Sequence, residues 1–158
     1  MTTTARKALN DLRHAHGMLE AEEDVTRFRV LWVAAISLAR AVGHVLSKID
    51  ATTSPVMRSA VSTAYASWKG SPSENSIFFE FIESERNSVL KEYEFGFLSG
   101  PTDIATTDGS AFILDENLFC PLSYGPYAGE DCRDILADAI NWWNSQLEKI
   151  ESIANAGA

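Results

Sequence analysis

The sequence has few cysteines, few basic residues and no long apolar run. Cys120 and Cys132 are the only cysteines in 158 residues and form no CxxC pair, so neither a disulfide framework nor a structural zinc site is indicated, although one bridge between them stays open. Lys and Arg total 13 against 22 Asp and Glu, and the net charge of −9 argues against non-specific binding to DNA or anionic lipid. No stretch reaches the roughly 18 uninterrupted apolar residues of a membrane helix.

The rest of the composition is that of a folded domain. Apolar residues make up 46% of the chain and charged residues 22%, which excludes disordered and fibrous classes. The length suits one domain over residues 1–158 with its own core. The first residues lack the apolar core of a secretory signal, so we expect a cytoplasmic protein without membrane association. No P-loop, Rossmann fingerprint or metal-ligand spacing occurs, so we expect neither cofactor nor metal.

Charge is unevenly divided along the chain. Residues 1–70 carry nine Lys and Arg and six Asp and Glu, a net charge of +3, whereas residues 71–158 carry four and sixteen, a net charge of −12. Any anion site should therefore draw on the first half. A less specific function also stays open, in which the acidic second half of the chain binds a basic partner.

Apolar residues recur at three- and four-residue spacing in five segments, which predicts five α-helices. The pattern is clearest over residues 25–49, which we expect to form a central helix. Ser54 and Pro55 predict the start of the next helix, and Ser71 with Glu74 has the spacing of a capping box. The expected helices cover residues 9–19, 25–49, 55–70, 71–97 and a last segment that starts near residue 130.

Residues 99–129 break the helical spacing. Glycine and proline cluster there, and Asp108-Gly109 precedes the apolar run 111–114, which predicts a small hairpin or meander. The expected fold class is mainly α, a five-helix bundle with a short β insertion before the last helix.

An arginine is predicted at an unusual position in the fourth helix. On a helical wheel, Arg86 falls in the middle of the apolar face that carries Phe78, Ile82 and Val89, with Glu85 at its edge. Burying an unpaired guanidinium is very costly, so Arg86 must meet a carboxylate, backbone carbonyls, a wet cleft or an anion. An internal ion pair is the favoured interpretation, and contact with a phosphate is the alternative.

The central helix carries a polar stripe in an otherwise apolar sequence. Its members follow a 3-4-3 spacing and are Ser37, Arg40, His44 and Ser47. One hypothesis is that Arg40 and His44 face Glu85 and Arg86 across a shared polar cleft. The alternative is that the stripe faces solvent or a dimer partner.

The order of the helices, the segment Ala39-Arg40-Ala41-Val42 and the pair Arg86-Asn87 together resemble the HEPN superfamily of small helical-bundle proteins. The resemblance covers residues 5–97 and the last helix. It implies a homodimer, an association with defence or toxin–antitoxin systems and, in active members, metal-independent cleavage of RNA. The family motif places four to six residues between its arginine and a histidine. This chain has Lys91, Glu92 and Tyr93 there, so the catalytic half of the motif is missing.

We therefore expect a non-catalytic HEPN-like binding or regulatory protein whose ligand is a nucleotide, an RNA or a partner protein. The expected binding residues are Arg40, Glu85, Arg86 and Asn87. The alternative is a metal-independent ribonuclease or nucleotidyl-group hydrolase in which Arg86 stabilises phosphate charge and His44 transfers protons. The enzyme requires His44 close to Arg86 in a cleft open to RNA.

Overall fold

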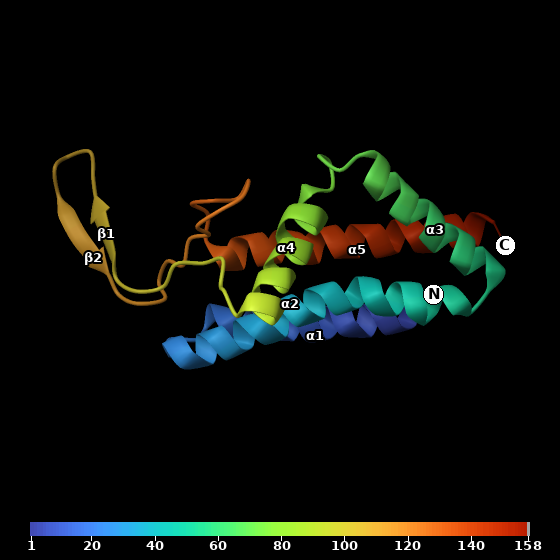
Figure 1. Ribbon diagram of the computed structural model, residues 1–158, viewed down its shortest axis with the longest axis horizontal. Coiled ribbons are helices and arrows are strands. Elements are labelled where there is room, and N and C mark those ends of the chain that lie inside the picture. Colours follow the sequence, from blue (N-terminus) through green and yellow to red (C-terminus); the bar gives the residue numbers. More distant parts are fainter. Residues whose placement is uncertain (158) are drawn as a thin grey trace.

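The computed structural model describes residues 1–157, and these form a mainly helical protein with one small antiparallel sheet (Figure 1). This confirms the expected class and the β insertion before the last helix. The helices are α1 (Thr3–Glu20), α2 (Val25–Lys48), α3 (Pro55–Gly70), α4 (Ser84–Asn87) and α5 (Cys132–Ala156), and the strands are β1 (Thr102–Ala105) and β2 (Ala111–Leu114). A short 3-10 helix, η1 (Asp50–Thr52), precedes α3, and two π-helical segments, η2 (Ile77–Glu83) and η3 (Ser88–Glu92), flank α4.

Helix α2 lies at the centre of the packing. It runs beside α1 and α5 along the long axis of the molecule, while α3 packs on α5 and α4 crosses α2 (Figure 1). By length and composition alone, the segment Val25–Thr52 could cross a membrane. In this structure, however, its apolar face is buried in the core through Phe28, Trp32, Ile36 and Leu46. A core helix of this kind has the same composition as a membrane span.

Aromatic rings fill the space between α3, η2 and α5. Trp143 is fully buried and donates its indole N–H to the Ala39 carbonyl at 2.8 Å. Trp142 is half-buried, stacks on Phe78 with ring centroids 5.4 Å apart and also contacts Trp68. Trp142 therefore enlarges the core.

Some of the helix ends lie where the sequence predicts them, and others do not. The Ser54 hydroxyl accepts a hydrogen bond from the Met57 N–H, which confirms the predicted start of α3. The capping box at Ser71 does not form, because residues 72–75 make a turn and the helical run through η2 starts only after them. This run ends at Glu92 rather than residue 97, since Tyr93 adopts the left-handed conformation with φ of 55°.

The predicted hairpin is present. Strands β1 and β2 pair antiparallel with Ile104 opposite Phe112 and Ala105 opposite Ala111, and Gly109 supplies the positive φ that the turn requires. The two cysteines beyond it are buried as free thiols, and desolvation raises the pKa of both.

A buried carboxylate ties the helical run through α4 to the rest of the fold. Glu85 is only 2% exposed, and its carboxylate accepts hydrogen bonds from the Trp32 indole N–H at 2.8 Å, the Gly96 N–H at 2.9 Å and the Tyr124 hydroxyl at 2.7 Å. A Cβ atom at Gly96 would overlap this carboxylate, which explains the glycine. Glu85 thus joins α2, α4 and both ends of the insertion, and it fixes the rotation of α4 about its axis.

The first and last helices are joined by polar contacts near their ends. The Glu151 carboxylate accepts hydrogen bonds from the Thr2 N–H at 2.9 Å and from the Arg6 guanidinium at 2.7 Å. The Arg6 hydrogen bond, with help from Thr2, holds the pKa of Glu151 at about 2, below the ordinary value of 4.5. Asp50 is also buried and accepts the N–H groups of Thr4 and Ala5 at the first turn of α1.

We predict that Glu85→Ala lowers the free energy of unfolding by about 3 kcal/mol, since it leaves the Trp32 and Gly96 N–H groups buried without an acceptor and opens a cavity. Glu85→Gln should lose much less, because its amide oxygen keeps both acceptor bonds. Urea unfolding followed by tryptophan fluorescence measures both values. A loss below about 1 kcal/mol for Glu85→Ala would show that this carboxylate does not hold the fold together.

We predict that Glu151→Gln destabilises the protein near neutral pH and that the difference from wild type disappears as pH falls. The pKa of Glu151 is lowered by folding, so its contribution is complete above pH 4.5 and is lost as pH falls toward about 2. Urea unfolding at several pH values measures the difference, with Glu148→Gln as the exposed control on the same helix. A difference that stays constant between neutral pH and pH 2 contradicts the assignment.

Candidate functional site

The helical run from Ile77 to Glu92 turns Arg86 away from the core. Its buried positions repeat every four residues, as 77, 81, 85 and 89, with 78 and 82 beside them. This spacing is longer than the 3.6 residues of an α-helix and matches the wider π turns of η2 and η3. The α-helical wheel was therefore wrong here, because it assigned the central buried position to Arg86 instead of Glu85.

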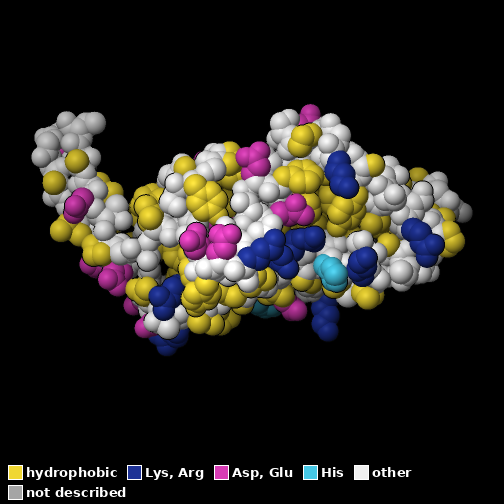
Figure 2. Space-filling model, in the orientation of Figure 1, with side chains coloured by type: hydrophobic (Ala, Val, Ile, Leu, Met, Phe, Trp, Pro, Cys, Tyr) yellow, Lys and Arg dark blue, Asp and Glu magenta, His cyan; other side chains and the backbone are white. Residues whose placement is uncertain are grey.

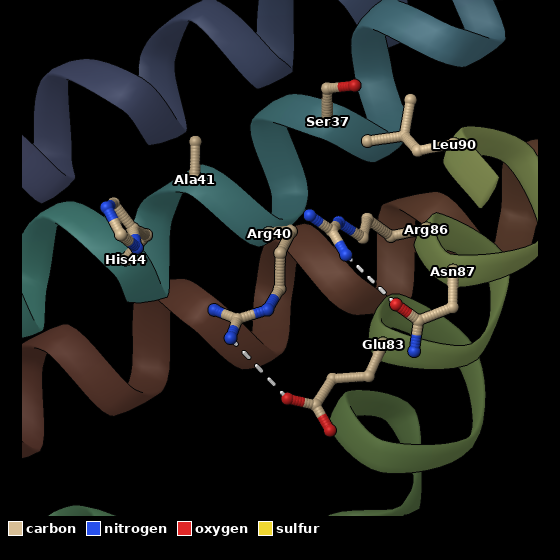
Figure 3. A pocket seen from close by; sticks show the side chains of 8 residues that line it. All are labelled: Ser37, Arg40, Ala41, His44, Glu83, Arg86, Asn87 and Leu90. Atoms are coloured by element: carbon tan, nitrogen blue, oxygen red, sulfur yellow. Dashed lines mark hydrogen bonds and ion pairs between the residues drawn. The ribbon is translucent and has the colours of Figure 1, made fainter.

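Arg86 instead lines an open pocket between α2 and α4, with a volume of about 450 Å³. Figure 2 shows basic side chains and a histidine gathered on this face of the molecule, where α4 crosses α2. Three lining residues come from the predicted polar stripe of α2, and the others include the predicted pair Arg86-Asn87 (Figure 3). The complete lining is Ser37, Arg40, Ala41, His44, Glu83, Arg86, Asn87 and Leu90.

Arg40 has an acidic and an aromatic neighbour. Its guanidinium lies 3.7 Å from a Glu83 carboxylate oxygen (Figure 3) and 6.0 Å from the centre of the Phe78 ring. The first contact is a partly exposed ion pair longer than a hydrogen bond, and the second is a cation–π contact. Burial raises the pKa of the neighbouring Tyr65 hydroxyl, which donates to the Gly43 carbonyl at 2.9 Å. Arg40 thus lines the pocket with part of its charge offset by Glu83.

Arg86 has no carboxylate partner among residues 1–157. Its Nη1 donates to the Asn87 Oδ1 at 3.0 Å, and the side chain is half-buried (Figure 3). The favoured interpretation from the sequence, an internal ion pair, is therefore wrong, since the ion pairs of the described chain do not include Arg86. A guanidinium has five N–H donors, and a single neutral amide leaves most of them directed at solvent or a ligand.

The other predicted residues divide between the pocket and its surroundings. His44 and Ser37 line the pocket from α2, but Ser47 does not. Glu85 lies outside it, because its carboxylate faces the core on the opposite side of α4. The hypothesis of a shared cleft thus holds for Arg40, His44 and Arg86 and is wrong for Glu85.

The sequence analysis did not predict three of the lining residues, which are Ala41, Glu83 and Leu90. Glu83 forms the ion pair with Arg40. Leu90 is 48% exposed, and Leu90 and Ala41 are the apolar residues of the lining. Glu83, Arg86 and Leu90 follow at three- and four-residue steps, the spacing that places side chains on one side of a helix.

The pocket combines positive charge with a small apolar wall. Two arginines against one glutamate give the lining a net charge of +1 with His44 neutral, in a protein whose net charge is −9. Planar guanidinium groups and an amide suit the oxygens of a phosphate or carboxylate. No group of three or more potential metal ligands occurs within residues 1–157. The two arginines and the amide of the lining suit an anionic group.

Comparison with known proteins identifies no relative. No protein-family model, no curated protein and no solved structure matches this chain.

Proposed function

We propose that this protein binds a phosphate-bearing ligand, a nucleotide or an RNA, in the pocket between α2 and α4 and that it is a binding or regulatory protein rather than an enzyme. The observation that carries the proposal is the Arg86 guanidinium, which lines the pocket without a carboxylate partner in the described chain. Beside it lies Arg40, whose guanidinium is 3.7 Å from a Glu83 carboxylate oxygen and 6.0 Å from the centre of the Phe78 ring. Two arginines at one pocket provide a site for several phosphate oxygens.

The local helix geometry supports the same site. Single π turns inside helices are frequent at functional sites, and here two π segments flank the short α4 from which Arg86 and Asn87 project. The apolar side chains Leu90 and Ala41 at the rim offer a surface for a nucleobase or a similar planar group. A nucleotide or the end of an RNA strand combines both chemistries.

The resemblance to HEPN proteins supports a nucleotide or RNA as ligand, and it accounts for the proposed absence of catalysis. We therefore also propose that the chain is a five-helix bundle of that type. It would act in defence or toxin–antitoxin systems and be located in the cytoplasm. The positions where the family motif carries its histidine hold Lys91, Glu92 and Tyr93, which are exposed and do not line the pocket.

We predict that Arg86→Ala weakens binding of adenosine monophosphate or a short 5′-phosphorylated RNA by ten- to one-hundredfold, because charge-assisted hydrogen bonds to phosphate are lost. Arg86→Lys should restore only part of the affinity, since an ammonium lacks the planar fork. Isothermal titration calorimetry on the full chain measures both, and unphosphorylated adenosine tests the role of the phosphate.

The matched control is Arg29→Ala, which removes an exposed arginine of α2 that does not line the pocket. It should leave affinity unchanged. Equal losses in the Arg29 and Arg86 variants, or no binding of any phosphorylated probe to the wild type, would overturn the proposal.

A metal-independent ribonuclease or nucleotidyl-group hydrolase is the second candidate, and the observation that favours it is that His44 lines the same pocket as Arg86. Imidazole exchanges protons near neutral pH, and arginine stabilises phosphate charge. Our proposal predicts that the purified protein does not cleave labelled RNA in EDTA. Cleavage that persists in EDTA and is lost in both His44→Ala and Arg86→Ala would establish the enzyme instead.

A further inference from the structure

The β1–β2 hairpin projects away from the helices as a separate arm. In Figure 1 it extends beyond one end of α2 and α5, and none of its strand residues belongs to the buried core. Phe112 is 49% exposed and Ile113 is 67% exposed. An isolated two-stranded hairpin is marginally stable in water, so an apolar arm of this kind gains stability when further strands or another surface cover it.

The two edges of the arm differ in how well they are protected from pairing. The edge of β1 carries Asp103 and follows Pro101, and a charge and a proline are the usual means of blocking an edge strand. The edge of β2 has the sequence Ala-Phe-Ile-Leu without charge or proline. The free edge of β2 is therefore the one that can accept another strand.

The register of the hairpin fixes which backbone groups that edge offers. The Thr106 N–H donates to the Ser110 carbonyl at 2.8 Å, so residues 110, 112 and 114 direct their backbone groups toward β1. The N–H and C=O groups of Ala111 and Ile113 then point outward along the free edge. An antiparallel copy of the same strand satisfies them when Ala111 pairs with Ile113 and Phe112 lies opposite its own counterpart.

We propose that β2 of one chain pairs antiparallel with β2 of a second copy, which joins two hairpins into a four-stranded sheet centred on Phe112. The edge is self-complementary in this register, since apolar residues oppose apolar residues on both sides of a two-fold axis. The two Phe112 side chains lie on one face in a closely spaced pair, with Ile104 and Leu114 of each copy beside them. The proposal depends on the arm alone and is independent of the ligand pocket.

Charge limits the strength of this contact. Residues 92–132 contain eight acidic and no basic residues, and the antiparallel register brings the turn that holds Asp108 toward the turn that holds Glu116 of the other copy. Four-residue strands also bury much less than the roughly 1,200 Å² of a stable interface. The dimer should therefore be weak, dependent on concentration and stronger at high salt, because salt screens exposed like charges.

The test uses two proline variants of the full chain that differ only in the edge they block. Ala111 and Ala105 are directly opposite in the ladder, and each directs its N–H to a free edge, β2 for Ala111 and β1 for Ala105. Ala111→Pro removes a donor that the dimer needs, whereas Ala105→Pro removes the equivalent donor from the opposite edge. Analytical ultracentrifugation over a wide concentration range measures the association.

The expected result is a reversible dimer for wild type and Ala105→Pro, at least a tenfold weaker dimer for Ala111→Pro and a stronger dimer for Glu116→Gln. Phe112→Cys should also form an intermolecular disulfide in oxidised glutathione, while Ile104→Cys on β1 should not. A monomer at every concentration and salt level overturns the proposal. A dimer that both proline variants weaken equally, or that neither variant weakens, also overturns the proposal, because the contact between the two copies then lies elsewhere on the chain.

Discussion

The buried carboxylate of Glu85 is the contact on which the arrangement of this protein depends. It accepts hydrogen bonds from the core helix α2, through Trp32, and from the segments that enter and leave the insertion, through Gly96 and Tyr124. Leaving these donors unpaired in the core would be costly, so the helical run has one favourable rotation about its axis. With Glu85 inward, the next residue, Arg86, is turned to the edge of the run and faces α2.

This rotation separates the polar groups of the helical run by function. The side toward the core carries the Glu85 carboxylate, which accepts three hydrogen bonds, and the side toward the pocket carries Arg86, which makes one side-chain hydrogen bond within residues 1–157. Positive and negative charges are also concentrated in different parts of the molecule. Positive groups gather at the pocket, whereas the arm and its connections are acidic and have no basic residue to attract the same ligands. A phosphate group is thus directed to one place on a negatively charged protein.

The sequence was sufficient for those parts of the fold that depend on local rules. Regular spacing placed α2, Ser54 marked the start of α3, and Asp108-Gly109 marked the hairpin turn. The site was predicted in part, since the 3-4 spacing on α2 placed Arg40 and His44 on one face. The rotation of α4 could not be derived from an α-helical wheel, because π turns flank α4 and because Glu85 is oriented by contacts with Trp32 and Gly96, which lie 53 and 11 residues away.

A crystal structure grown with tungstate tests the central claim, that Glu85 faces the core and leaves Arg86 free to bind an anion. Tungstate mimics phosphate and is located by its anomalous scattering. The account predicts an ion bound between the Arg40 and Arg86 guanidinium groups, with the Glu85 carboxylate bonded to the Trp32 indole. Arg86 paired with a carboxylate in the core, and a pocket that holds no ion, would contradict it.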